Sequence, residues 1–293
     1  MRILLTGANG QVGWELVSTL AVLGDLAAVD REECDLADPD QIVRLVREVQ
    51  PDLIVNAAAY TAVDEAESEP ERAFAINARA PGILAEEAKR HGALLVHYST
   101  DYVFDGAKQA PYTEDDEPDP INAYGRTKLA GERAIQAAGC RHLILRTSWV
   151  YASRGRNFLL TILRLAREQR VLRVVDDQVG SPTWCREIAA ATATLLAKPE
   201  LAAPGAGGLY HLSASGSTSW FGFARAIFDA PEVAGLGVEP PALEAVPSSA
   251  YPTAARRPRN SRLDCRRLAR HAGVRLAPWD DALGRCMAEL QRR

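Results

Sequence analysis

Short, uninterrupted apolar runs alternate with helix-like segments through the first half of the chain. The expected strands cover residues 3–6, 26–30, 53–58, 94–99 and 143–147, and the expected helices cover 13–23, 39–50, 73–91 and 122–138. Strands that are apolar along their whole length are typical of a parallel sheet that is covered on both faces. We therefore expect an α/β fold with a Rossmann-type doubly wound parallel sheet.

The sequence changes in texture after about residue 150. Further helices are expected over residues 158–170 and 188–198, and a surface loop over 202–208. Residues 231–258 hold six prolines and are expected to be rich in loops. We predict one domain over residues 1–150, and a smaller C-terminal lobe over 151–293 that is partly interleaved with it.

Composition excludes several classes of protein. The formal net charge of -4 gives no electrostatic basis for binding nucleic acid. Five scattered cysteines without a CxxC pair indicate reduced thiols rather than a disulfide framework or a zinc site. No apolar stretch approaches the ~20 residues that cross a bilayer. Because the first strand follows Met1 directly, we expect no signal peptide, no membrane partner and a cytoplasmic location.

A glycine-rich turn connects the first expected strand to the first expected helix. Gly7, Gly10 and Gly13 are spaced G-x-x-G-x-x-G. Glycine permits a tight turn and a close approach of the backbone to a ligand. The helix after the turn presents free N–H groups and the positive end of its dipole to a pyrophosphate. We predict that this turn, with Asn9, Gln11 and Val12, binds an NAD(P) cofactor, so that residues 1–150 form an NAD(P)-binding Rossmann domain.

The ends of the next strands supply further candidate cofactor contacts. Asp30 ends the second strand, where an acidic side chain holds the ribose hydroxyls of the adenosine. Arg31 is the next residue and suits a 2′-phosphate, so this pair leaves open the choice between NADH and NADPH. Other predicted cofactor contacts are Asp35, Leu36, Ala57, Ala58, Ala59, Tyr60 and Tyr98.

Tyr124 and Lys128 form the sharpest catalytic pattern in the chain. A spacing of four residues places both on one face of a helix, one turn apart. An ammonium beside a phenol favours the phenolate and lowers the pKa of the tyrosine. Such a pair can act as the acid–base catalyst of a carbonyl reduction. Thr100, at the end of the fourth strand, is the first candidate to hydrogen-bond the substrate carbonyl, with Ser99 in reserve.

Two charged segments and one turn lie near these residues. Asp101 and Tyr102 come directly after the fourth strand and are expected to contact the substrate or the nicotinamide. The acidic run of residues 114–117 is expected to be a solvated surface rather than a metal site. The arginines of residues 256–259 suit either a solvated loop or a binding surface.

These motifs resemble the extended short-chain dehydrogenase/reductase superfamily and, within it, the dTDP-4-dehydrorhamnose reductase family. The resemblance runs essentially from end to end. Its motifs lie in residues 7–13, 55–64, 99–106, 124–128, 146–151, 177–183 and 257–264.

The resemblance implies reduction of the C4 keto group of dTDP-4-dehydro-6-deoxy-L-mannose (dTDP-4-dehydrorhamnose) to dTDP-L-rhamnose by NADPH or NADH. It implies that Tyr124 donates the proton, that Lys128 holds the nicotinamide ribose, and that Thr100, Asp101, Tyr102 and Trp149 contact the sugar. Residues 257–264 would belong to the substrate lobe. Tyr60 stands where the family pattern carries histidine, and either side chain can flank a nicotinamide.

The resemblance also raises the possibility of Mg²⁺ and of a homodimer. Glu15, Glu187 and Glu289 occupy positions that could bind the metal, although scattered glutamates are more typical of a protein surface. The metal ligands therefore stay unassigned.

Three alternative functions share the fold. A sugar-nucleotide 4,6-dehydratase usually carries an acidic residue where this chain has Tyr102, because elimination needs that acid–base group. A nucleotide-sugar 4-epimerase needs only Tyr124 and Lys128, so it stays open. A non-catalytic regulatory subunit, such as that of methionine adenosyltransferase, would not require the intact pair.

Overall fold

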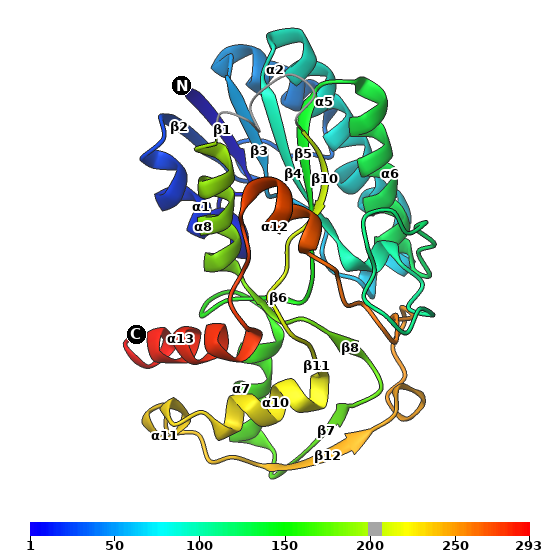
Figure 1. Cartoon of the computed structure of the whole chain (residues 1–293), viewed down its shortest axis with the longest axis vertical. Helices are drawn as coiled ribbons and strands as arrows, with labels where there is room; N and C mark the ends of the chain where they lie inside the picture. The colour runs from blue at the N-terminus through cyan, green and yellow to red at the C-terminus, as the bar shows by residue number, and fades with distance from the viewer. Residues whose placement is uncertain (199–206) are drawn as a thin grey trace.

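The computed structural model describes residues 1–198 and 207–293, which form a larger part around a sheet and a smaller part below it (Figure 1). The sheet has six parallel strands in the order β10-β5-β4-β3-β1-β2. They are β1 (Arg2–Thr6), β2 (Asp25–Val29), β3 (Leu53–Asn56), β4 (Leu94–Thr100), β5 (Arg141–Thr147) and β10 (Gly208–His211). The chain order reverses beside β1, as in a doubly wound sheet.

Helices cover both faces of this sheet because its strands are apolar on both sides. Leu4 and Ile54 pack toward α2 and α5, whereas Leu5 and Val55 pack toward α1 and α8. The expected strands and helices of the first half are present within a few residues. The helices of this part are α1 (Gln11–Ala21), α2 (Pro39–Val49), α3 (Glu65–Ser68), α4 (Pro70–Phe74), α5 (Ala80–His91), α6 (Ala123–Ala138), α8 (Cys185–Leu196) and α12 (Arg266–Ala272).

The smaller part has its own apolar core, in which Leu159, Phe223 and Met287 are fully buried. The remaining elements are β6 (Val150–Tyr151), α7 (Phe158–Glu168), β7 (Val171–Val175), β8 (Val179–Gly180), β9 (Thr183–Trp184), β11 (Thr218–Ser219), α10 (Trp220–Asp229), α11 (Glu232–Gly235), β12 (Ala242–Val246), the short turn η3 (Ser248–Ala250) and α13 (Trp279–Gln291). β7 and β12 form a parallel pair at its outer edge.

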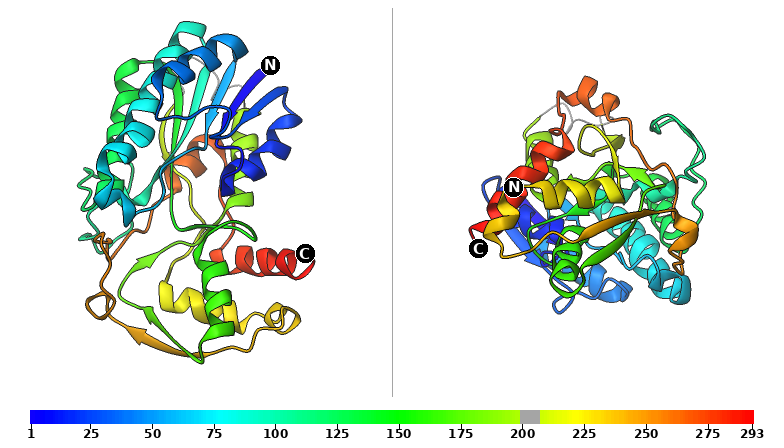
Figure 2. Two further views of the ribbon diagram at one scale, coloured as in Figure 1. Left: turned by 180° about the vertical axis from the view of Figure 1, so that it is seen from behind. Right: turned by 90° about the horizontal axis from the view of Figure 1, so that it is seen from below.

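The second half of the chain passes repeatedly between the two parts (Figures 1 and 2). α8 packs against α1, β10 joins the main sheet beside β5, and α12 lies against β10. The chain then returns to the smaller part as α13. A boundary near residue 150 therefore does not separate the sheet from the smaller part. One strand of the sheet, β10, lies on the C-terminal side of this boundary.

One sequence expectation differs from the structure. The single helix expected over residues 73–91 is divided by a π-helical turn, η1 (Ala75–Arg79). Residues 231–258 are rich in loops, as expected, and they also contain α11 and β12, which contact α13 and β7. The loop expected over 202–208 lies mostly outside the described residues. Across the described ranges, no helix combines the length and apolarity needed to cross a bilayer.

Candidate active site

The glycine turn is shaped by backbone contacts that no side chain could share. Gly7 has φ +77°, and a Cβ there would lie 2.6 Å from the Ala58 nitrogen. A Cβ on Gly13 would lie 2.0 Å from the Gly7 carbonyl oxygen. No side chain caps the N-terminus of α1 at Gly10, so its first N–H groups have no side-chain acceptor at the cap. This open, uncharged cradle fits the pyrophosphate of a dinucleotide.

The predicted ribose-binding residues meet beside this turn. Asn9 donates a side-chain hydrogen bond to Asp30. Arg31 and Asp35 form only an exposed ion pair at 3.8 Å, and the side chain of Leu36 is buried below them. The arrangement places an acidic group and a loosely paired basic group within the same loop.

The end of β3 completes the cofactor side of the site. The Ala57 N–H donates to the Thr6 carbonyl over 3.1 Å, which joins the ends of β3 and β1. The Tyr60 N–H donates to Asn77 Oδ1 over 2.8 Å, and Asn77 lies on the π-helical turn η1. The break in the long helix thus aims an amide side chain at the loop that holds Ala59 and Tyr60.

The far side of the turn contacts the smaller part of the molecule. Asn157 caps α7 and also donates from Nδ2 to Gln11 Oε1 over 2.9 Å. Val12 packs against the apolar clusters of both parts. The predicted cofactor turn is therefore fastened to both parts of the chain.

Tyr124 stands at the start of α6 against the turn after β4. A Cβ on Gly125 would lie 2.1 Å from the Tyr102 carbonyl oxygen, so glycine permits this close approach. The Tyr124 and Tyr102 rings meet edge to face, with centroids 5.9 Å apart. Burial raises the pKa of Tyr124 to about 12, opposed by a hydrogen bond with Thr100. The phenol therefore stays protonated at neutral pH.

Lys128 is fully buried one turn further along α6, and burial lowers its pKa to about 8. Its Nζ lies 2.6 Å from the Tyr98 carbonyl oxygen and 3.1 Å from His97 Nε2. The expected lowering of the pKa of Tyr124 by this ammonium is absent, because Nζ is held against β4 and burial of the phenol dominates. Only the backbone of Tyr98 faces Lys128, since its hydroxyl lies 2.7 Å from Thr192 Oγ1 on the opposite face of the sheet.

Thr100 and Asp101 form a buried polar pair beside Tyr124. Thr100 Oγ1 donates to Asp101 Oδ1 over 2.9 Å, and Ser148 Oγ donates to Asp101 Oδ2 over 2.8 Å. Burial raises the pKa of Asp101 to about 6, against these hydrogen bonds. The reserve candidate Ser99 is engaged elsewhere, because its hydroxyl donates to the buried carboxylate of Glu132.

Trp149 is held in an unusual backbone conformation just beyond β5. Its φ is +45°, in the left-handed region that favours glycine. Its ring stacks on Trp220 of α10, with centroids 3.5 Å apart and planes within 2°. A Cβ on Gly180 would lie 2.4 Å from the Trp149 ring. Contacts with the smaller part of the molecule therefore fix the orientation of this indole.

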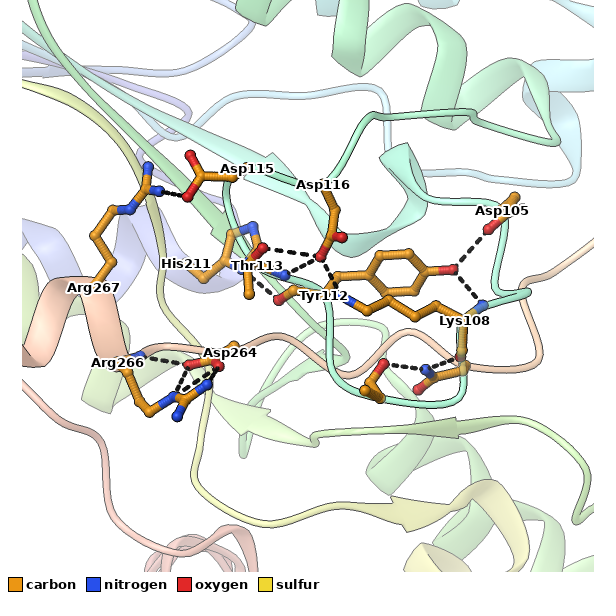
Figure 3. A network of polar contacts seen from close by, with 12 residues as sticks. Asp105, Lys108, Tyr112, Thr113, Asp115, Asp116, His211, Asp264, Arg266 and Arg267 are labelled. Atoms are coloured by element: carbon orange, nitrogen blue, oxygen red, sulfur yellow. Dashed lines mark hydrogen bonds and ion pairs between the residues drawn. The ribbon is translucent and has the colours of Figure 1, made fainter.

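The acidic run of residues 114–117 is only partly the solvated surface expected of it (Figure 3). Asp115 and Glu117 are exposed, as expected. The side chain of Glu114 is only 3% exposed; it pairs with Arg267 and accepts from the His211 N–H over 2.9 Å. Asp115 also pairs with Arg267, and Asp116 pairs with Lys108 at 2.6 Å. These contacts join the loop after β4 to the C-terminal segment that precedes and forms α12.

The segment of residues 256–259 is anchored in a similar way. Arg257 pairs with Asp64 at 2.5 Å, and its hydrogen bond with Tyr102 lowers the pKa of that phenol against the stronger effect of burial. Arg257 is therefore not a free basic side chain, whereas Arg256 and Arg259 are exposed. The contact brings the C-terminal half of the chain to the turn after β4.

The three candidate metal ligands are engaged with arginines. Arg186 pairs with both Glu15 and Glu289, and Arg285 pairs with Glu187. Glu15 and Glu289 are buried, so the expectation of surface glutamates is wrong for them. Within residues 1–198 and 207–293, no group of three or more metal-ligating side chains is arranged to hold an ion.

Sequence reasoning missed Asn56, Asn77 and His97, which lie around the predicted catalytic residues. Asn56 and His97 are almost fully buried, and each follows a run of apolar residues in its strand. A polar residue in such a strand needs a partner, because an unpaired buried polar group is costly. The sequence therefore indicated that each of these residues needs a partner, but it did not indicate which residue that partner is.

A cradle for a dinucleotide beside a tyrosine and a lysine one helical turn apart defines a short-chain dehydrogenase/reductase, on a Rossmann-type sheet with a second, smaller part. The chain matches the RmlD substrate binding domain family over residues 1–292. It belongs to that family.

Relatives that span the whole chain agree with this membership. The chain is 49% identical over 297 residues to the dTDP-4-dehydrorhamnose reductase of Burkholderia thailandensis, covering 99% of each chain. It is 48% identical to that of Salmonella typhimurium, covering 99% of this chain and 98% of the relative. The dTDP-4-dehydrorhamnose reductase of Bacillus anthracis, solved in complex with NADP, superposes with a TM-score of 0.89 at 35% identity, covering 98% and 99%.

Proposed function

We propose that this protein reduces the C4 keto group of dTDP-4-dehydro-6-deoxy-L-mannose to give dTDP-L-rhamnose, with NADPH or NADH as the reductant. The observation that carries the proposal is the full-length similarity to dTDP-4-dehydrorhamnose reductases, one of them 49% identical, in a chain that keeps Tyr124 and Lys128 together on α6. A UDP-glucose 4-epimerase that is only 20% identical supports the fold and not the epimerase alternative.

Tyr124 is the proposed proton donor to the developing alkoxide at C4. Its pKa of about 12 keeps the phenol protonated until a stronger base forms beside it. Thr100 is the proposed second hydrogen-bond donor to the same oxygen, for which its hydroxyl proton would turn from Asp101 Oδ1 to the substrate. Lys128 is the proposed contact to the nicotinamide ribose, and its positive charge would stabilise the phenolate that proton donation leaves behind.

The cofactor side is proposed to be built by the glycine turn and the ends of β2 and β3. Gly7, Gly10 and Gly13 would admit the pyrophosphate, and Asp30 or Arg31 would meet the adenosine ribose. Ala57, Ala58 and Ala59 would lie along the dinucleotide, with Tyr60 near the nicotinamide. The reduced nicotinamide, when bound, supplies the hydride.

The substrate side is proposed to use Asp101, Tyr102 and Trp149. The apolar face of the Trp149 ring suits the methyl group of a 6-deoxysugar. Stacking on Trp220 would keep the ring in the orientation that this contact needs. Tyr102 carries no carboxyl group, so the C6 elimination of a dehydratase would lack an acid–base group there. A homodimer and a cytoplasmic location stay predictions, and Mg²⁺ has no part in the proposed chemistry.

Transfer of the hydride gives the test. The protein is mixed with dTDP-4-dehydro-6-deoxy-L-mannose and NADPH that carries deuterium at the transferable position. A reductase consumes one reduced cofactor per sugar and places the label at C4 of dTDP-L-rhamnose. Isomerised sugar with the label retained on the cofactor would identify an epimerase instead. Cofactor binding without turnover would support a regulatory subunit.

A further inference from the structure

A chain of buried hydrogen bonds leads from Lys128 away from the proposed substrate. Lys128 Nζ lies 3.1 Å from His97 Nε2, and His97 Nδ1 lies 3.1 Å from Asn56 Nδ2. The three side chains are each no more than 1% exposed. These hydrogen bonds run from α6 through β4 to β3, so they join the proposed catalytic helix to the strand that ends at the proposed cofactor cradle.

The direction of these hydrogen bonds is set by one backbone group. Asn56 Oδ1 accepts from the Ala58 N–H over 3.2 Å and from Thr6 Oγ1 over 2.8 Å. A backbone N–H can only donate, so the amide oxygen must face Ala58 and the amide NH₂ must face His97. His97 Nδ1 therefore accepts a hydrogen bond and carries no proton.

The tautomer of His97 is then determined. Burial, and secondarily the charge of Lys128, lowers the pKa of His97 well below its ordinary value, so the imidazole is neutral. A neutral imidazole without a proton on Nδ1 carries it on Nε2. That N–H points at Lys128 Nζ.

This donor favours one protonation state of Lys128. An ammonium has three donors and no lone pair, so it cannot accept the His97 Nε2–H, whereas the neutral amine can. The amine still donates to the Tyr98 carbonyl over 2.6 Å. Burial of Lys128 acts in the same direction as the hydrogen bond.

The other charged groups around Lys128 either favour its charged form or leave its protonation unchanged. Glu132, one turn further along α6, raises the pKa of Lys128. Both oxygens of Glu132 are held by Arg146 of β5, at 2.9 and 2.6 Å, so much of its charge is compensated. Asp101 acts on Tyr124, and the Tyr98 hydroxyl lies on the opposite face of β4.

We propose that His97 is a positioning residue that, oriented by Asn56, donates through Nε2 to Lys128 and favours its neutral amine form in the cofactor-free enzyme. We call the hydrogen-bonded series Asn56–His97–Lys128 the relay. The relay sets the pH at which Lys128 loses its charge. Its effect on turnover rests on the proposed function, in which the charged lysine assists proton donation by Tyr124. kcat/KM should therefore fall as the pH rises through the pKa of Lys128, which is about 8.

The titration of Lys128 can be measured without any substrate. The chain has four lysines, Lys89, Lys108, Lys128 and Lys198, so ¹³C labelling at lysine Cε gives few NMR signals, and Lys128→Met assigns the one of interest. His97→Gln replaces the imidazole by an amide that can turn its oxygen to the ammonium. We expect this variant to raise the pKa of Lys128 by about one unit, the scale of one hydrogen bond to a charged group.

Two further variants sharpen the test. Asn56→Asp would accept from Nδ1–H, reverse the tautomer of His97 and let Nε2 accept from the ammonium, so it too should raise the pKa of Lys128. His211→Gln is the matched control, because His211 is equally buried but its Nδ1 lies 3.1 Å from the Tyr112 carbonyl oxygen, away from Lys128. The control should leave the titration of Lys128 unchanged.

The tautomer of His97 can be measured independently in the unmodified protein. ¹⁵N spectra of the five histidines should show the His97 proton on Nε2, and a proton on Nδ1 would overturn the proposal even if no variant folds. An unshifted Lys128 titration in folded His97→Gln would also overturn it. If the relay is present but no dTDP-keto sugar is reduced, the proposed function fails and the relay stands.

Discussion

The two sides of the site differ in whether backbone groups or side chains form them. The proposed cofactor side, around the ends of β1 and β3, consists mainly of backbone: glycines, short side chains and an open helix terminus. The proposed catalytic side, around β4, β5 and α6, consists of buried polar side chains that contact one another across the sheet. A backbone site needs few specified residues, whereas a side-chain site depends on every partner being present.

The buried pair of Glu132 and Arg146 shows what that dependence costs. Both side chains are 2% exposed, and Arg146 donates to both carboxylate oxygens. Removing one member of such a pair leaves an uncompensated buried charge. The exposed Arg31–Asp35 pair on the cofactor side carries no comparable penalty. The catalytic side should therefore be the more fragile of the two.

The largest effect should come from Arg146→Met. The substitution leaves Glu132 buried without its partner, and we expect a loss of about 3–5 kcal/mol in the free energy of unfolding. Urea denaturation monitored by circular dichroism measures this loss. The double variant Glu132→Leu with Arg146→Met should recover much of the stability. A single variant that loses no more than Arg31→Ala would remove the contrast between the two sides.

Tyr124→Phe should lower kcat by about 100-fold, the usual scale for loss of a general acid. The ring still packs against Tyr102, so stability and cofactor affinity should change little. Steady-state kinetics and a fluorescence titration with NADPH separate these quantities. Tyr251→Phe, at a tyrosine that is 53% exposed, is the control and should be fully active. Near-normal turnover by Tyr124→Phe would refute the assignment of the proton donor.

Gly13→Ala should affect the cofactor side selectively. The new methyl group would lie 2.0 Å from the Gly7 carbonyl oxygen, so the turn must move. We expect the affinity for NADPH to fall by about 10-fold, equivalent to roughly 1.4 kcal/mol and within the range for overpacking. Gly284→Ala in α13 is the matched control, since a Cβ there meets nothing within 4 Å. Unchanged affinity in Gly13→Ala would mean that the turn does not hold the cofactor.

The smallest effect should come from Asp30→Ala. The wild type should use both NADH and NADPH, because Asp30 suits ribose hydroxyls and Arg31 suits a 2′-phosphate. Removing the carboxylate relieves repulsion of that phosphate, so the ratio of kcat/KM values should shift several-fold toward NADPH, on the order of 1 kcal/mol. Initial rates with each cofactor give the ratio. An unchanged ratio, or a wild type that uses only one cofactor, contradicts this assignment.

Local patterns were enough to predict much of this molecule. The apolar runs indicated β1 to β5, and turn chemistry placed Gly7 to Gly13 before a helix. The spacing of Tyr124 and Lys128 placed both on α6. These features depend on residues that are close together in the sequence, where helical and strand periodicities operate.

Contacts between distant residues were decided only by the tertiary structure. The return of β10 to the sheet depends on pairing with β5, more than 60 positions earlier. Glu114 and Asp115 are held by Arg267, and Glu15 and Glu289 by Arg186. A charged residue in a sequence shows the need for a partner but not which partner it meets. Hence the sequence by itself determined five strands of the sheet, the glycine turn and the helix that carries Tyr124 and Lys128. The groups that orient Lys128 were decided only by the tertiary structure, because burial and long-range polar pairing arise only when the strands are assembled.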